Sequence, residues 1–238
     1  MTILGIETST AVCSVGCARL GSLSNGGQAN GYGVRMEKSL FESHIHSEKL
    51  LTLIQELCDE QKLKLSQLDG VAVSIGPGSF TGLRIGLSTA KGLCFALKKP
   101  LIAVPTFASI ATSVTIAHPE CARVIVCIDA KQREYYIGMY EQFNGTLQEV
   151  LAVRIGSITS ALTSVSLNTV IVTDHIDEVQ AESADSFIVE KVFPYCRGDV
   201  IAQIAIEKWN TKDRRTWEQL EPMYLKDFIV RTQLRSEK

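Results

Sequence analysis

The sequence has almost no net charge, so it lacks the basic surface with which a protein binds RNA or DNA unaided. It carries 24 Lys and Arg against 26 Asp and Glu, a formal net charge of −2. A nucleic-acid-binding domain usually shows Lys and Arg clustered on one face. The mildly basic set Lys208, Lys212, Arg214 and Arg215 has acidic neighbours and is expected to form a solvated face. Any RNA contact would need a local basic patch or a more basic partner.

Long apolar runs and paired cysteines are also missing. No run approaches the roughly 20 residues of a membrane-spanning helix, and we expect neither a span nor a secretory leader. The seven cysteines are an odd set without the paired spacing of metal sites. Most lie in apolar segments, where a thiol behaves as a small hydrophobe. These features predict a reduced, cytoplasmic protein.

Signatures of autonomous catalysis are sparse. No Gly-Lys-Ser/Thr follows the glycine-rich stretch, which excludes a Walker loop, and no Gly-x-Ser-x-Gly elbow surrounds a serine. The chain has 4 histidines, and no spacing singles out His44, His46, His118 or His175 as the base for a serine or cysteine nucleophile. A peptidase role therefore has little support in the sequence.

The most informative feature that is present is the stretch 74–86, Ser-Ile-Gly-Pro-Gly-Ser-Phe-Thr-Gly-Leu-Arg-Ile-Gly. It connects an apolar segment, residues 71–75, to a helical pattern that continues to Leu97. A strand, a glycine turn and a helix start present backbone N–H groups and the positive end of a helix dipole, which suit an anion. Ser79 is the expected N-cap. The residues alone leave two interpretations open, a ligand-binding loop or a simple turn.

The helix after this loop combines an apolar stripe with small residues. Its stripe runs through Phe80, Leu83, Leu87, Ala90, Cys94 and Leu97. Gly82, Gly86 and Gly92 lie beside the stripe, although an interior glycine costs a helix about 1 kcal/mol relative to alanine. Glycines are tolerated where another backbone approaches closely. That approach is either tight packing within the monomer or a helix-to-helix subunit interface.

The order of elements predicts an α/β protein with two lobes. We expect strands at residues 2–6, 11–18, 32–36, 71–75, 101–104, 123–128, 134–140, 151–155 and 169–173. We expect helices after His46-Ser47-Glu48, after the glycine loop, from Pro105-Thr106 to about Thr112, and over 199–210. Residues 1–104 are predicted to form the N-terminal lobe and 105–238 the C-terminal lobe. The last segment is a candidate to pack back on the first lobe.

Together these motifs resemble the bacterial TsaB (YeaZ) family. The resemblance rests on the strand that ends at Glu7-Thr8-Ser9-Thr10, on His46-Ser47-Glu48, on the stretch 76–86, on Pro105-Thr106 and on Pro-Met-Tyr-Leu-Lys at 222–226. It covers essentially the whole chain and implies the two-lobed actin/sugar-kinase/Hsp70-like (ASKHA) fold. It also implies a non-catalytic subunit of the complex that forms N6-threonylcarbamoyladenosine next to the anticodon of tRNAs reading codons that begin with A.

The same resemblance implies the partners. They are a TsaD-like catalytic paralogue, for which this chain would be scaffold and dimerisation partner, and a TsaE-like ATPase. The chain alone would form a homodimer, and tRNA would be contacted mainly through the complex, with no membrane involved. The interface is expected on the first two long helices, at His46, Leu50, Leu53, Ile54, Leu57, Gly82, Leu83, Gly86, Leu87, Ala90 and Cys94.

The nucleotide and metal apparatus of the fold looks degraded in this sequence. Nucleotide-hydrolysing members place an aspartate at the end of the first strand, where this chain has Glu7. Catalytic paralogues carry His-x-x-x-His on a helix, where this chain has Glu42 and His46. We therefore expect no metal and no cofactor, with a nucleotide at a subunit junction as an open alternative. The residues that could face a phosphate are Glu7, Thr8, Ser9, Gly76, Gly78 and Arg84.

Arg84 and Asp129 complete the candidate set. A cation in the first turns of a helix is poorly placed for the dipole, so Arg84 is expected to pair with an acid in a partner, an acid in the same chain or a bound phosphate. Asp129 is expected to be a structural or partner-contact acid. The rival function is an autonomous Mg-ATP-dependent phosphotransferase or ATPase that uses Glu7, Ser9, the loop 76–78 and Asp129.

Overall fold

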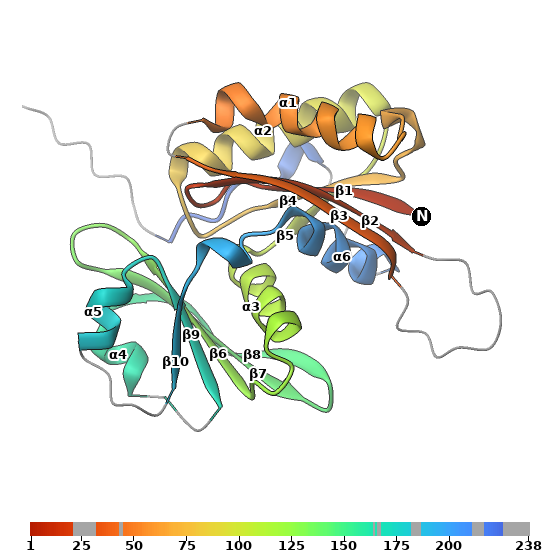
Figure 1. The fold of residues 1–238 in the computed structure, drawn as a ribbon. Coiled ribbons are helices and arrows are strands. Elements are labelled where there is room, and N and C mark those ends of the chain that lie inside the picture. Colours follow the sequence, from red (N-terminus) through yellow and green to blue (C-terminus); the bar gives the residue numbers. More distant parts are fainter. Residues whose placement is uncertain are drawn as a thin grey trace, which may run out of the picture.

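Two five-stranded sheets with the same topology form the two lobes of the molecule (Figure 1). The structure is a computed structural model, and it describes residues 1–20, 32–42, 45–163, 165, 168–181, 187–210 and 217–225. The strand orders are β3-β2-β1-β4-β5 and β10-β9-β6-β7-β8. In each sheet the first three strands along the chain are antiparallel neighbours, a fourth pairs in parallel with the first of them, and a fifth pairs in parallel with the fourth.

The first sheet is formed by β1 (Thr2–Glu7), β2 (Val12–Leu20), β3 (Tyr32–Phe41), β4 (Gly70–Ser74) and β5 (Leu101–Val104). Every residue of β1 and β4 is buried, because helices cover both faces of the sheet. This explains why these strands read as continuous apolar runs and do not alternate between apolar and polar residues.

One face of the first sheet carries α1 (His46–Glu60) and α2 (Phe80–Leu97), and the other carries α6 (Gly198–Glu207), which returns from the C-terminal half (Figure 1). Leu50, Leu57 and Leu87 pack from the two long helices onto Leu4 and Val73 of the sheet. On the opposite face α6 packs on β1 and β2 and completes the lobe.

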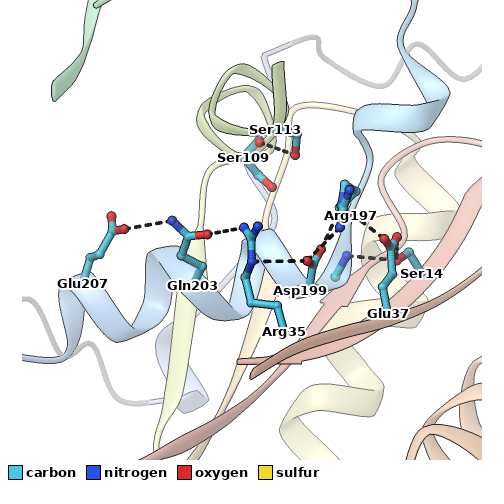
Figure 2. Close-up of polar contacts among 10 residues, drawn as sticks. Ser14, Arg35, Glu37, Ser109, Ser113, Arg197, Asp199, Gln203 and Glu207 are labelled. Atoms are coloured by element: carbon cyan, nitrogen blue, oxygen red, sulfur yellow. Dashed lines mark hydrogen bonds and ion pairs between the residues drawn. The ribbon is translucent and has the colours of Figure 1, made fainter. Parts of the chain in front are cut away.

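A polar network fixes the start of α6 against β2 and β3 (Figure 2). The guanidinium of Arg197 bridges the carboxylates of Glu37 and Asp199, with closest N–O distances of 3.2 and 2.8 Å. Ser14 donates from its hydroxyl to Glu37 at 2.8 Å and accepts from the amide of Gly198 at 2.9 Å. The buried carboxylate of Asp199 is therefore neutralised, and the network ties the C-terminal helix to the first lobe.

The second sheet is formed by β6 (Arg123–Asp129), β7 (Tyr135–Phe143), β8 (Thr146–Gly156), β9 (Thr169–Thr173) and β10 (Ile188–Lys191). On one face α3 (Thr106–Ala117) packs through Phe107 and Ile110 against Val124 and Val126. The short α4 (Ile158–Leu162) and α5 (Ile176–Ala181) cover the other face. The second sheet thus has a hydrophobic core on each of its two faces.

Most expected elements are confirmed, and two of them, residues 101–104 and 169–173, have the predicted bounds. The structure extends the strand expected at 32–36 to Phe41 and starts the strand expected at 151–155 at Thr146. It adds β10, α4 and α5, which were not expected. All seven cysteines are buried free thiols. Among the described residues, no helix is long and apolar enough to cross a membrane.

Candidate functional site: the glycine junction and the interlobe cleft

The glycine loop between β4 and α2 joins three segments of the chain. Ser79 is the N-cap of α2, as expected, and its hydroxyl accepts from the amide of Gly82 at 3.2 Å. The amide of Ser79 donates to the carbonyl of Ser9 at 2.7 Å, and that of Gly76 donates to the hydroxyl of Thr106 at 3.1 Å. Two N–H groups of this loop and one in the first turn of α2 are thus used inside the molecule. This loop, the turn after β1 and the start of α3 form what we call the glycine junction.

Thr8 lies against the backbone of α2, and this close contact explains why two positions of the helix are glycine. A Cβ at Gly82 would lie 2.0 Å from the carbonyl oxygen of Thr8, and a Cβ at Gly86 would lie 2.2 Å from the Thr8 hydroxyl. That hydroxyl also donates to the carbonyl of Gly82 at 2.8 Å. The glycines therefore permit close packing within the monomer, the first of the two interpretations. A Cβ at Gly92 would meet nothing within 4 Å, so this explanation does not extend to it.

The residues predicted to form the subunit interface are buried in the first lobe, so this prediction is wrong for their side chains. They face the sheet or the neighbouring helix, since an apolar stripe packs on whatever core is nearest. They are His46, Leu50, Leu53, Ile54, Leu57, Gly82, Leu83, Gly86, Leu87, Ala90 and Cys94. The outer faces of the two helices carry different apolar side chains, Leu51 and Phe95, which are 61% and 71% exposed.

Glu7 is enclosed at the end of β1, where it does not line the cleft between the lobes. Its Oε1 accepts from the amide and the hydroxyl of Ser9. Within the described part of the chain, Oε2 and the hydroxyl of Ser74 have no hydrogen-bond partner. Burial raises the pKa of the Glu7 carboxyl, and the bonds from Ser9 offset this rise only in part. The carboxyl belongs to the glycine junction and does not line the cleft.

A cleft of about 1260 Å³ opens between the lobes next to the glycine junction. Of the residues predicted to face a phosphate, Ser9, Gly78 and Arg84 line it, whereas Glu7, Thr8 and Gly76 do not. The opposite wall comes from the second lobe, where the ends of β6 and β9 place Asp129 and Asp174. Asp129 and Asp174 thus line the cleft, whereas the carboxylate at the end of the first strand does not.

The acids of the second lobe are held by bonds from within that lobe. The amide of Asp129 donates to Asp174 at 3.0 Å, and the ammonium of Lys131 pairs with Asp129 at 2.6 Å. Burial acts to raise the pKa of Asp129, but the bonds from Lys131 outweigh it, and the pKa is lowered. Burial raises the pKa of Asp174. The structural role expected for Asp129 agrees with these contacts.

The turn after Asp129 has an unusual backbone. Lys131, Gln132 and Arg133 all have positive φ, 67°, 63° and 63°. Non-glycine residues adopt this left-handed conformation at a cost of about 1–2 kcal/mol each. The turn is closed by a bond from the amide of Ala130 to the carbonyl of Glu134 at 2.8 Å. It holds Lys131 and Gln132 at the wall of the cleft.

Sequence reasoning missed a series of polar contacts beside this turn. The hydroxyl of Tyr135 donates to Glu178 at 2.6 Å, and His175 Nδ1 lies 3.1 Å from the other oxygen of Glu178. His175 Nε2 lies 3.9 Å from Asp129. The signal in the sequence was Thr173-Asp174-His175 directly after a buried strand, where side chains reach the carboxyl end of the sheet.

The described residues do not place His46 in a group that could hold a metal ion. His46 Nε2 lies 3.1 Å from the carbonyl of Val12, and the ring is buried at the start of α1. Glu42 is exposed, and the two residues do not form a pair. His44 lies outside the described residues. Among those described, no group of three His, Cys, Asp or Glu side chains could hold a metal ion.

The segment 217–225 lies along α2 and reaches the glycine junction. Leu220 is buried in the core of the first lobe, and the amide of Met223 donates to the carbonyl of Ile75 at 2.6 Å. Arg84 donates from Nε to the Tyr224 hydroxyl at 3.0 Å, with its guanidinium 3.7 Å from the centre of the Phe80 ring. Lys212, Arg214, Arg215 and Lys226, named in the sequence interpretation, lie outside the described residues.

Comparison with known proteins identifies a family that this chain matches. The family model for TsaD, tRNA N6-adenosine threonylcarbamoyltransferase, matches residues 41–205. The chain belongs to this family. Similar curated proteins are named tRNA threonylcarbamoyladenosine biosynthesis protein TsaB. The Escherichia coli protein is 31% identical over 142 residues, and the Haemophilus influenzae protein is 30% identical over 136 residues. The resemblance to TsaB (YeaZ) proteins is confirmed.

These two alignments cover 60% and 57% of this chain but only 56% and 52% of the relatives, about half of their length. A TsaB from Buchnera aphidicola subsp. Schizaphis graminum aligns over more, at 27% identity across 89% of this chain and 96% of that protein. The solved structure of YeaZ from Pseudomonas aeruginosa has a TM-score of 0.76 at 24% identity and covers 94% of this chain and 99% of that one. The expected two-lobed ASKHA-type fold is thereby confirmed.

Proposed function

We propose that this chain is the non-catalytic subunit of the complex that forms N6-threonylcarbamoyladenosine next to the anticodon of tRNAs reading codons that begin with A. The names of its relatives, TsaB biosynthesis proteins, and its membership of the threonylcarbamoyltransferase family support this role. Its partner would be a TsaD-like catalytic paralogue, joined by a TsaE-like ATPase. tRNA would be bound mainly through the complex.

The observation that carries the non-catalytic role is the closed glycine junction. Enzymes of this fold leave the end of the first strand open to a metal–phosphate complex. Here Glu7 is buried and bonded to Ser9, and the amide of Ser79 is taken by the carbonyl of Ser9. Of the residues predicted to face a phosphate, Glu7 is enclosed and Thr8 bonds to the backbone of α2, whereas Ser9, Gly78 and Arg84 line the cleft. These internal hydrogen bonds make a scaffold more rigid, whereas an ATPase would need the same groups to bind its substrate.

The partner interface would lie on the outer faces of α1 and α2, which run side by side over the first sheet (Figure 1). Leu51 and Phe95 are the large apolar side chains exposed there. An interface needs apolar side chains that leave water on binding, which the buried stripe of α2 cannot supply. In the absence of the paralogue, the same face would pair with a second copy as a homodimer.

A reconstituted modification assay tests this proposal. The measurement is threonylcarbamoyladenosine formed on a tRNA transcript by the TsaD-like and TsaE-like proteins of the same genome, read by mass spectrometry. Omission of this chain should abolish product. Glu7→Gln should retain it, because a buried structural carboxyl tolerates an isosteric amide. Loss of product with Glu7→Gln in a folded chain would indicate that the carboxylate is catalytic.

The interface is tested in the same assay with a charge on each helix. Leu51→Asp combined with Phe95→Asp should abolish product, whereas Phe143→Asp should not. Phe143, at the end of β7 in the second lobe, is 62% exposed and so makes a matched control. Equal product from both variants would place the partner elsewhere on the molecule. Magnesium-dependent ATP turnover by the isolated chain would favour the rival ATPase function.

A further inference from the structure

Two cations on α2 lack an acidic partner among the residues that the structure describes. Arg84 uses Nε on the Tyr224 hydroxyl and its flat face on Phe80. The ammonium of Lys91 reaches only the carbonyl oxygen of Glu218, at 3.4 Å. Five other Lys and Arg side chains, those of Arg35, Lys38, Arg123, Lys131 and Arg197, do form ion pairs with carboxylates. Arg84 and Lys91 are therefore available to an external anion.

Both cations line one groove of about 420 Å³ between α2 and the segment 220–224. Leu87 and Leu220 form an apolar floor, and Ser88 adds a hydroxyl to the α2 side. Among the described residues of the lining, Glu221 is the one acid, and it lies on the opposite side. The groove is thus apolar at its base and carries a cation toward each end of its α2 wall.

The spacing of the cations defines what fits. Arg84 and Lys91 are seven residues apart, close to two helical turns, so they lie on one face with a rise of about 10.5 Å between them. A peptide in the extended polyproline II conformation has three residues per turn and rises about 3.1 Å per residue, so carboxylates three positions apart lie on one face about 9 Å apart. A peptide of this kind would place a carboxylate on each cation and one of the two side chains between them over the apolar floor.

We propose that this groove binds an extended acidic segment of a partner protein, with Asp or Glu at positions three apart and an apolar residue between them. Arg84 is well placed for this contact, because Phe80 and Tyr224 hold its side chain while its two terminal nitrogens have no hydrogen-bond partner among the described residues. A pre-oriented guanidinium fork loses little entropy when it binds a carboxylate in bidentate fashion. The position of Arg84 near the start of α2, unfavourable for the helix dipole, is then offset by the partner's charge.

An acidic protein segment fits this groove better than an RNA strand does. Binding RNA through its backbone takes several phosphate contacts, and the groove offers two cations beside the carboxylate of Glu221. The formal charge of the whole chain, −2, adds no wider attraction for phosphate. The apolar floor, in contrast, matches an aliphatic side chain.

Fluorescence anisotropy with a defined probe tests the proposal. The probe is a fluorescein-labelled nonapeptide of three Glu-Leu-Ala repeats, measured with the full chain at low salt. We expect saturable binding that weakens as salt rises. Lys91→Ala should weaken it by about tenfold, the loss expected for one charge-assisted contact. Glu221→Gln should strengthen it, because a like charge is removed. Lys49→Ala, on the exposed surface of α1, is the matched control and should change nothing.

Lys91→Ala is the decisive variant, since Arg84→Ala could also release the segment 221–225 from α2. Arg84→Lys keeps the charge without the fork and should lose part of the affinity. Three results would each overturn the proposal: no binding of the probe, equal binding of a Gln-Leu-Ala analogue, or no effect of Lys91→Ala. Tighter binding of a ten-nucleotide oligouridine through the same residues would also overturn it, in favour of RNA. The probe is not a protein of the modification complex, so failure of this test would leave the proposed function unaffected. Failure of the modification assay would likewise leave the peptide-binding proposal unaffected.

Discussion

Gly86→Ala should destabilise the protein strongly, because the added methyl group has no room. The new Cβ would lie 2.2 Å from the hydroxyl oxygen of Thr8, where ordinary contacts begin at 3.4 Å. Thr8 is buried, and moving its hydroxyl would break the 2.8 Å bond to the carbonyl of Gly82. Overpacking costs about 1–3 kcal/mol and a buried unpaired group costs about 1–3 kcal/mol more. Alanine favours the helix over glycine by about 1 kcal/mol, so the free energy of unfolding should fall by about 3 kcal/mol in total.

Urea unfolding followed by circular dichroism measures this loss as a lower midpoint at constant slope. Gly92→Ala is the matched control on the same helix, where an added Cβ meets nothing within 4 Å. It should raise stability by about 0.5–1 kcal/mol through helix propensity alone. The double variant Thr8→Ala with Gly86→Ala should recover part of the loss, since the clashing hydroxyl is gone. Equal stability of Gly86→Ala and wild type would refute the close packing at Thr8.

Three further predictions concern the junction, the strained turn and the network of α6. Burial raises the pKa of Glu7 in the folded state above its unfolded value, so the free energy of unfolding of wild type falls as pH rises between these two pKa values. Glu7→Gln has no such titration. Its stability relative to wild type should therefore increase from pH 5 to pH 8 in paired urea titrations. A difference that shrinks with pH would contradict the buried carboxyl. Gln132→Gly should be more stable than Gln132→Val by about 1–2 kcal/mol in thermal unfolding, because valine resists positive φ; equal melting temperatures would argue against a left-handed turn. Arg197→Ala should cost about 1–3 kcal/mol, because buried Asp199 would keep only Arg35, whose Nε lies 4.0 Å away (Figure 2), and an unchanged urea midpoint would rule that out.

The local signals of the sequence were sufficient for most elements of the fold. The cap at Ser79, the apolar stripe that follows it and the proline before Thr106 each mark a helix through chemistry within a few residues. Strand β10 and helices α4 and α5 were missed because they have only 4, 5 and 6 residues, which is too short for a periodic pattern. Their positions depend on the sheet that they cover.

The candidate site was predicted less well, because its contacts link residues distant in sequence. The stripe on α2 correctly marked an apolar face, but a stripe packs equally well on the chain's own sheet or on a partner. The small residues beside it were explained only when Thr8 appeared beneath Gly82 and Gly86. Nothing near Arg84 in the sequence indicated Tyr224, which lies 140 positions further along.

The central claim is that this chain works as a partner-binding scaffold through the outer faces of α1 and α2. The most direct test is light scattering during size-exclusion chromatography, on the chain alone and in an equimolar mixture with the TsaD-like protein of the same genome. The account predicts a homodimer that exchanges into a single heterodimer peak, and a Leu51→Asp, Phe95→Asp variant that stays monomeric in both samples. Two unchanged peaks in the wild-type mixture would contradict it.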